Sequence, residues 1–335
     1  MNYLSIIDKY RLKDITVMKA IDLLTSSAFM MMAAMAVALM TNFCGWFPSD
    51  VLDAGLRSNL TIGTLVVMLT LSMSRIPLQN LNPMKYGKSL ARAIMLGMVI
   101  ASLIPLIGYF LLKDTEYANQ AVGLVFIAAT PFAGSVLPLS IILRGDPEHA
   151  ARGTIAVYIL SLAWIPFIVW FALAGSVDMQ FLIITVIELI GIPLVLSRLL
   201  ARFEIDRTVI AVFLNCCIFF MVWLSVGSTP FAGFPLWIFV VFIVIAILRS
   251  FGLGLCVELV EKKSGVPWKQ RVTDILMASY KNKGVAIALC VALFPQGMVA
   301  IATSILVEIT WVAFMDSVLF SKKRMEREIG SETQS

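Results

Sequence analysis

The chain has 335 residues, of which 60% are hydrophobic and only 14% are charged. Soluble domains use roughly 45–50% apolar residues, so this composition excludes an ordinary soluble protein. The formal net charge of +5 needs no nucleic-acid partner, because the distribution of Lys and Arg between the loops accounts for it.

Runs of about 20 apolar residues recur along the chain, as membrane-spanning helices require. The alternating polar and apolar positions of a transmembrane barrel do not occur. We therefore predict an all-α polytopic protein with ten spans, at residues 20–46, 58–76, 91–113, 119–143, 151–175, 179–200, 207–228, 234–258, 271–294 and 297–320.

The loops between these spans differ in charge. Most of the 26 Lys and Arg lie in the N-terminal segment, the even-numbered loops and the C-terminal tail. Positive charge marks the cytoplasmic side, so we expect both termini in the cytoplasm and a multi-pass protein in the plasma (inner) membrane of a prokaryote. The first residues lack the pattern of a signal peptide.

The ten spans divide into two halves of five, residues 20–175 and 176–320. A cytoplasmic N-terminal segment (1–19) precedes them and a cytoplasmic tail (321–335) follows. Because five is odd, the halves would have opposite orientations, as in inverted-repeat transporters, whose sites lie at discontinuous helices near the bilayer midplane. This arrangement predicts that spans four and nine are both interrupted.

Both spans contain the expected helix-breaking residues. Span four holds Pro131, Gly134 and Pro138, and span nine holds the polar run from Ser279 to Gly284. A single proline usually produces only a kink, but two interruptions at matching positions predict broken helices that line a site. Lys281 marks this site most strongly, because a cation near the midplane costs roughly 2.5–3.5 kcal/mol.

The segment from Met277 to Leu289 resembles the ninth-helix motif of the bile acid:sodium symporter family. Further similarities are Pro131 with Asp146, Pro105, Pro166 and Leu71–Arg75. The resemblance implies a core domain (spans three to five and eight to ten) and a panel domain (spans one, two, six and seven). Broken helices four and nine would cross in the core, and an organic anion would bind between core and panel for secondary active transport by alternating access.

The sodium ligands that the resemblance would supply are largely missing. Met277 and Lys281 stand at the family's glutamate and glutamine of helix nine. Other ligand positions hold Ile100, Val136, Leu137 and Ala150, while Asn282 and Thr154 retain polar groups. The resemblance therefore implies altered or absent sodium coupling. We expect no cofactor, sodium being the one ion that the family would supply, and no other metal.

Three hypotheses for Lys281 stay open. Its ammonium could take the place of a coupling cation, or Lys281 or Lys283 could bind the substrate anion at the positive end of a half-helix. The simplest alternative is a structural ion pair with Glu308, at a similar depth in span ten. The coupling or charge-pair candidates are Lys281, Glu308 and Thr154, and the substrate-binding candidates are Phe132, Gly134, Ser135, Pro138, Ser279, Tyr280, Asn282 and Lys283.

Other polar residues suggest structural roles. We expect Arg249 to pair with Asp274 and Asp316, and the loop residue His149 to be solvated. No set of residues typical of an enzyme or an ATP-driven pump is present. The expected partners are the lipid bilayer and a small organic anion (bile-acid-like or a small carboxylate), without nucleic acid. A sodium-coupled symporter with rearranged sites, an anion channel and a non-transporting sensor remain alternatives, and the oligomeric state is left open.

Overall fold

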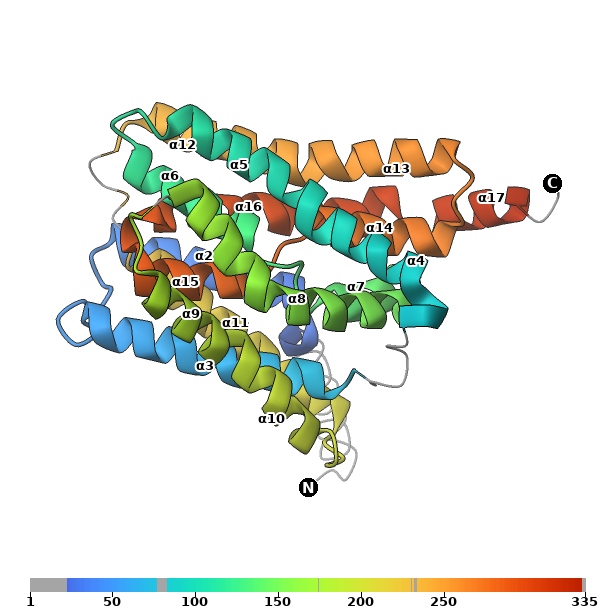
Figure 1. Cartoon of the computed structure of the whole chain (residues 1–335), viewed down its shortest axis with the longest axis horizontal. Coiled ribbons are helices and arrows are strands. Elements are labelled where there is room, and N and C mark those ends of the chain that lie inside the picture. The colour runs from blue at the N-terminus through green and yellow to red at the C-terminus, as the bar shows by residue number, and fades with distance from the viewer. Residues whose placement is uncertain (1–22, 77–82, 174, 230, 232–233, 333–335) are drawn as a thin grey trace, which may run out of the picture.

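The computed structural model of the chain describes residues 23–76, 83–173, 175–229, 231 and 234–332. Every regular element in these ranges is a helix, and most helices run nearly parallel to the long axis of the molecule (Figure 1). The predicted all-α class is confirmed. The N-terminal segment of residues 1–19 lies outside the described residues.

Several of the long helices contain a single π-helical turn, here labelled η2, η3, η4 and η6. The elements in chain order are α2 (Ser27–Phe43), α3 (Ala54–Ser74), α4 (Pro83–Ile94), η2 (Met95–Ile100), α5 (Ala101–Leu112), α6 (Ala118–Ala129), α7 (Val136–Ile142), α8 (Pro147–Leu173), α9 (Met179–Val186), η3 (Ile187–Gly191), α10 (Ile192–Leu200), α11 (Arg207–Gly227), α12 (Leu236–Ile247), η4 (Leu248–Gly252), α13 (Leu253–Lys263), α14 (Trp268–Ser279), α15 (Lys283–Leu293), the 3₁₀ turn η5 (Pro295–Gly297), α16 (Met298–Phe314), η6 (Met315–Leu319) and α17 (Lys322–Glu332).

Seven helices are long and apolar enough to cross a bilayer: Ala54–Ser74, Tyr86–Leu112, Pro147–Leu173, Met179–Leu200, Thr208–Gly227, Leu236–Lys263 and Pro295–Leu319. Three shorter apolar helices are Phe29–Phe43, Ala118–Ala129 and Lys283–Leu293. The length and apolar character of these helices identify a multi-pass membrane protein, whose physical partner is the lipid bilayer.

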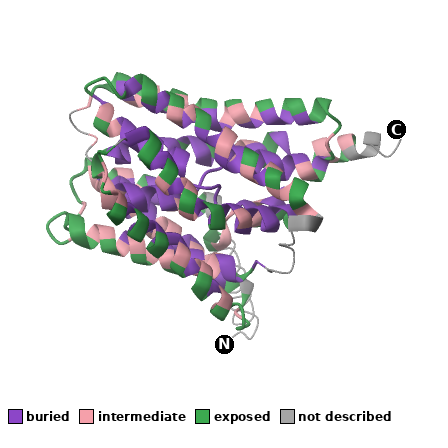
Figure 2. Ribbon diagram, in the orientation of Figure 1, coloured by how far each residue is buried: buried purple, intermediate pink, exposed green. Residues whose placement is uncertain are grey.

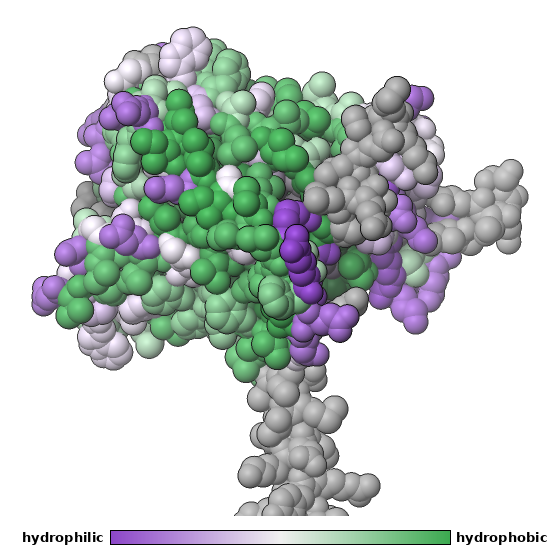
Figure 3. Space-filling model, turned by 60° about the horizontal axis from the view of Figure 1, so that its bottom comes forward, coloured by the Kyte–Doolittle hydropathy of each residue, from purple (hydrophilic) through white to green (hydrophobic). Residues whose placement is uncertain are grey.

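The outer surface of the helices is apolar, as contact with lipid requires. Large side chains such as Trp170, Phe171 and Val195 are exposed along the spans. Figure 3 shows a broad hydrophobic face with hydrophilic side chains gathered toward its sides. Buried residues concentrate in the middle of the molecule, along α6, α8, α14, α15 and α16 (Figure 2).

Aspartates before the apolar runs fix the start of three spans. Asp53, Asp178 and Asp206 are the N-caps of α3, α9 and α11, and each side chain accepts a hydrogen bond from a backbone N–H of the first turn. Four such N–H groups have no partner within a helix, so a capping carboxylate stabilises the end and matches the helix dipole.

The helices form two groups. In the smaller group, α2 and α10 pack against α11 and α3, respectively, and α11 packs against α3. The larger group contains α4 to α8 and α12 to α16. The groups meet where α15 lies against α3 and where α16 lies against α2. In Figure 1, α3, α10 and α11 of the smaller group lie toward the bottom of the view, and α5, α12 and α13 of the larger group lie at the top.

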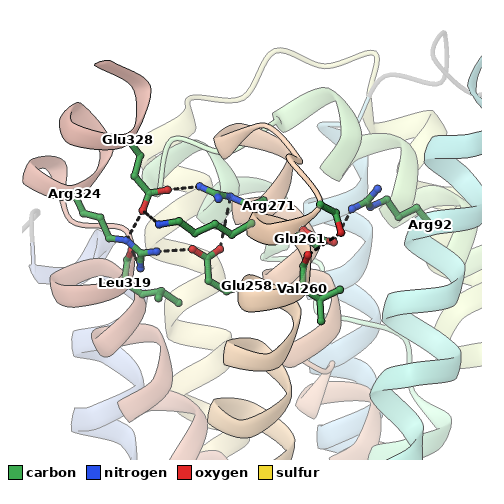
Figure 4. Close-up of polar contacts among 10 residues, drawn as sticks. Arg92, Glu258, Val260, Glu261, Arg271, Leu319, Arg324 and Glu328 are labelled. Carbon is green, nitrogen blue, oxygen red and sulfur yellow. Dashed lines mark hydrogen bonds and ion pairs between the residues drawn. The ribbon is translucent and has the colours of Figure 1, made fainter. Parts of the chain in front are cut away.

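The C-terminal helix α17 is held by a network of ion pairs (Figure 4). Glu328 accepts hydrogen bonds from Arg271 (2.5 Å), Lys262 (2.7 Å) and Arg324 (2.9 Å). Arg324 also donates to Glu258 of α13 at 2.5 Å. The expected C-terminal tail is therefore an ordered helix anchored to α13 and α14.

Candidate functional site

Two helices are interrupted at the positions that the sequence indicated. Residues 130–135 separate α6 from α7, and residues 280–282 separate α14 from α15. Thr130 adopts an extended conformation (φ −73°, ψ 150°). A residue before proline is driven toward this region, and Pro131 has no N–H with which to continue α6.

The two interruptions meet and pair like short antiparallel strands. Phe132 and Lys281 form an isolated bridge. Ala133 N donates to the carbonyl of Tyr280 at 3.0 Å, and Asn282 N donates to the carbonyl of Pro131 at 2.9 Å. Each unwound stretch thus satisfies backbone groups of the other, which makes the breaks tolerable inside a bilayer. The two breaks, which the sequence placed in different halves of the chain, therefore lie side by side, and we call this place the crossing.

The ammonium of Lys281 fills a cage of oxygen atoms at this crossing. Nζ lies within hydrogen-bonding distance of the carbonyl oxygens of Thr130 (2.6 Å), Ala128 (3.0 Å) and Gly97 (3.2 Å) and of the hydroxyl of Ser102 (3.1 Å), and its three N–H groups are shared among these four oxygens. All four acceptors belong to uncharged groups, and Lys281 is only 1% exposed. The cage is of the kind that holds a cation.

The cage is built from the end of one half-helix and the π turn of another helix. Ala128 and Thr130 close α6, where the last carbonyls of a helix have no partner within the helix. The negative end of the helix dipole also favours a cation there. Gly97 lies in η2, whose altered hydrogen bonding presents its carbonyl to the site.

Of the three hypotheses for Lys281, the ion pair with Glu308 does not form, because Glu308 pairs with other cations. Glu308 is fully buried, and its Oε1 contacts Lys283 Nζ at 3.1 Å and the guanidinium of Arg249. Depth along a span predicts the height of a side chain but not the side of the helix from which it projects, so sequence position alone selected the wrong lysine.

Arg249 contacts a carbonyl at the C-terminal end of α14, as Lys281 does at the C-terminal end of α6. From η4, its Nη1 donates to the carbonyl of Ser279 (3.1 Å), at the C-terminal end of α14, and its Nη2 donates to Ser250 Oγ (2.8 Å). The expected grouping of Arg249 with Asp274 and Asp316 is therefore wrong. Its position in the middle of a span was the signal that could have assigned Arg249 to the crossing.

Asp274 belongs to a different buried cluster. It contacts Arg92 Nε (2.7 Å) and His149 Nε2 (2.8 Å), while His149 Nδ1 lies 2.6 Å from Ser89 Oγ. His149 is 2% exposed, so the expectation of a solvated loop histidine is also wrong. Three helices, α4, α8 and α14, converge on this cluster.

One side of the crossing faces the smaller group of helices. A Cβ on Gly134 would lie 3.2 Å from Ser72 Oγ, and one on Gly284 would lie 2.9 Å from Leu65, both on α3. The hydroxyl of Tyr280 reaches Met31 Sδ of α2 at 4.0 Å. Gly134, Tyr280 and the start of α15 therefore lie at the junction of the two groups.

Asn282 holds the start of α15 at this junction. Its Oδ1 accepts a hydrogen bond from Val285 N at 3.0 Å, and its amide donates to the Tyr158 hydroxyl of α8. Ser135 adjoins Gly134 and is partly exposed, while Pro138, one turn into α7, is exposed. These residues remain substrate-contact candidates.

Two of the predicted substrate-binding residues, Phe132 and Ser279, are buried in the protein interior. Phe132 is fully buried and packs so closely on Gly97 that a Cβ there would collide with its ring. Ser279 is also fully buried, and its hydroxyl accepts a hydrogen bond from Trp311 Nε1 at 2.8 Å. Neither side chain faces the junction, since both fill the interior of the larger group.

Thr154 lies away from the oxygen cage. Its hydroxyl donates to the carbonyl of Ala150 at 2.7 Å, and the residue lines an apolar groove of about 390 Å³ between α8, α10 and the end of α3. The groove residues are Met73, Ile76, Thr154, Ile155, Ile159, Leu194, Val195, Arg198 and Leu199. Arg198 supplies a positive charge and donates to the carbonyl of Ile76 at 2.8 Å.

Comparison with models of known protein families finds no match to this chain. A search of curated protein sequences likewise finds no similar protein.

Proposed function

We propose that this protein is a secondary carrier of an organic anion that works by alternating access, with altered or absent sodium coupling. In this proposal, ten spans form two inverted repeats in the inner membrane of a prokaryote, with both termini in the cytoplasm. The smaller group of helices acts as the panel domain and the larger group as the core domain. The resemblance to the bile acid:sodium symporter family motivates this assignment.

The single observation that supports the proposal most is the oxygen cage around Lys281. Unwound carbonyls and the C-terminal ends of half-helices coordinate the sodium ions of inverted-repeat transporters. Here the same kinds of oxygen surround an ammonium that is part of the chain. A covalently attached amine already fills this cage, so a dissolved sodium ion has no place to bind there.

The groove between α8, α10 and α3 supports an organic anion as substrate. Its walls are almost wholly apolar, with Arg198 as the charged group. Ligand sites are mostly apolar with a few placed polar groups, and they occur preferentially where two domains meet. Thr154 lies one helical turn from Tyr158, which contacts Asn282 at the crossing, so the groove borders the same part of α8.

Uptake by proteoliposomes tests the proposal. We expect saturable uptake of labelled carboxylates or bile acids at the same rate with and without a sodium gradient. Lys281→Ala should reduce uptake by roughly tenfold or more, because it leaves several carbonyls unsatisfied in a dry interior. Lys263→Ala, at an exposed position of α13, is the matched control and should transport normally.

The variant also offers a stricter test. The emptied cage of Lys281→Ala retains four oxygen atoms that can act as ligands of a cation. Sodium or ammonium ions in the medium should therefore restore part of the uptake by this variant and leave uptake by the original protein unchanged. Sodium-dependent uptake by the original protein would instead favour a coupled symporter. A non-saturating flux would favour a channel, and binding without flux would favour a sensor.

A further inference from the structure

A second charged cluster at the crossing has no role in the proposal so far. It consists of Lys283 at the start of α15, Arg249 in η4 and Glu308 in α16. All three are buried, and they contain two cations and one carboxylate. Uncompensated charge is costly in an interior of low dielectric constant, and this cluster carries an excess of one positive charge.

The hydrogen bonding of the cluster is also incomplete. Among the described residues, Lys283 Nζ, Arg249 Nε and Glu308 Oε2 have no hydrogen-bond partner. Lys283 Nζ lies 3.1 Å from Glu308 Oε1, within ion-pair range but poorly aligned for a hydrogen bond. Buried polar atoms are almost always paired in native proteins, and exceptions cluster at functional positions. Both cations therefore retain donors for a further acceptor.

The position of Lys283 conflicts with local helix electrostatics. It is the first residue of α15, an eleven-residue helix whose N-terminal end carries partial positive charge. An acidic residue would stabilise this position, whereas a lysine adds repulsion. An anion bound there would satisfy both the dipole and the ammonium. Lys283 is 9% exposed against 1% for Lys281, so its side chain lies nearer the protein surface, although its Nζ itself is covered.

We propose that Lys283 and Arg249 form a carboxylate-binding site and that Glu308 is its internal counter-ion. In the unliganded protein, the Glu308 carboxylate holds the two cations. An incoming carboxylate accepts hydrogen bonds from Lys283 Nζ and Arg249 Nε, and its charge makes the cluster neutral. Charge-assisted bonds of this kind are the strong ones. This inference rests on the proposed transport of an organic anion and assigns the residues that bind its charged group.

Binding of acetate to the purified full-length protein in detergent tests this site. Choline acetate replaces choline chloride at constant ionic strength, and the thermal unfolding midpoint is recorded. We expect acetate to raise the midpoint of the original protein, since a ligand of the folded state stabilises it. Lys283→Gln should abolish the increase, and Lys263→Gln should not affect it.

Removal of Glu308 should enlarge the effect of acetate on the unfolding midpoint, whereas removal of Lys283 should abolish it. This contrast separates ligand binding from a purely structural role. Glu308→Gln should unfold at a lower temperature in chloride because two buried cations lose their partner. Acetate should raise the unfolding midpoint of this variant about twice as much as that of the original protein, because the free carboxylate replaces the missing one. If Glu308→Gln yields no folded protein, Glu308→Asp replaces it: its carboxylate is retained but is held farther from the two cations, so the midpoint in chloride should fall less and the extra gain from acetate should be smaller, but both should have the same direction.

The proposed carboxylate site would be rejected if acetate still raised the unfolding midpoint of Lys283→Gln. It would also be rejected if acetate raised the midpoint of the Glu308 variant no more than that of the original protein. A midpoint that is the same in chloride and acetate for every variant would also reject a carboxylate site. Acetate binding that depends on Lys283, in a protein that transports no organic anion, would keep the site and reject the carrier.

Discussion

At the scale of single residues, the two lysines of the crossing differ in their partners. Lys281 is surrounded by four uncharged oxygens, whereas Lys283 faces a carboxylate. Residues two apart on the chain project in different directions, and the break between α14 and α15 increases this divergence. One lysine is suited to hold the crossing together, and the other is suited to meet a ligand.

The sequence identified part of this site. Prolines and a glycine in span four, and cations in span nine, are costly inside a membrane, so their positions located both breaks and Lys281. Partner choice was not predictable, since it depends on helix rotation and on which neighbours pack at that height. For this reason Glu308 was assigned to the wrong lysine, and the buried contacts of His149 were missed.

Two glycines show how closely α6 packs against η5 at the start of α16. A Cβ on Gly123 of α6 would lie 2.0 Å from the carbonyl oxygen of Gly297, and one on Gly297 would lie 2.7 Å from Gly123 N. Both obstacles are backbone atoms, which cannot move aside by changing a rotamer. Small residues that permit such approach are typical of helix interfaces in membranes.

Gly123→Ala should therefore destabilise the protein by about 1–3 kcal/mol through overpacking. The measurement is the thermal unfolding midpoint of the purified protein in detergent. Gly63→Ala is the control, because a Cβ at Gly63 of α3 meets nothing within 4 Å. Equal midpoints for the two variants would show that α6 and α16 are not held at this distance.

At the scale of elements, α17 depends on the charge of one carboxylate. Burial alone would raise the pKa of Glu328, but hydrogen bonds from Lys262, Arg271 and Arg324 outweigh it and lower the pKa to about 2 from the ordinary 4.5. A carboxyl group whose pKa is lower in the folded state stabilises that state above its ordinary pKa. The contribution disappears as the pH falls from about 4.5 to about 2.

Acidification through this range should release α17 while the spans remain folded. A spin label at Lys323→Cys, in a variant without the native cysteines, would report the motion of the helix. We expect mobility to rise as the pH falls below about 4.5. Glu328→Gln should be mobile already at pH 7, and Glu326→Gln, at an exposed position, should behave like the parent. A label that stays immobile in Glu328→Gln would contradict this role.

At the scale of the whole molecule, the proposed carrier requires the two groups of helices to move against each other. They touch where Gly134 of the first break meets Ser72 of α3. Within the smaller group, a Cβ on Gly227 of α11 would lie 3.5 Å from Thr41 Oγ1 of α2. The first contact would change during transport, whereas the second would not.

Disulfide cross-links separate these contacts. In a variant without the native cysteines, Ser72→Cys with Gly134→Cys should abolish uptake on oxidation, and a reductant should restore it. In the two pairs, the hydroxyl oxygen that the cysteine sulfur would replace lies 3.2 Å and 3.5 Å, respectively, from the Cβ position of the glycine, close to what a disulfide needs. Thr41→Cys with Gly227→Cys should leave uptake unchanged. If the first cross-link forms and transport continues, the groups do not move apart at this contact.

The overall architecture was more predictable than the site. Long apolar runs and two interruptions are properties of the chain itself, and the spans expected at 119–143 and 271–294 correspond to α6 with α7 and α14 with α15. The arrangement of side chains at the junction of the two groups depends on tertiary packing. Phe132 and Ser279, expected to contact substrate, instead fill the interior of the larger group.

The ammonium of Lys281 is bound covalently and cannot leave with the cargo. In the form of the proposed carrier that has no sodium coupling, a monovalent anion would cross the bilayer with no accompanying positive ion. Each such event moves one negative charge through the membrane potential, which contributes about 2.3 kcal/mol per 100 mV. In a cell with a negative interior, that energy opposes accumulation and favours release, so the carrier would discharge its substrate outward.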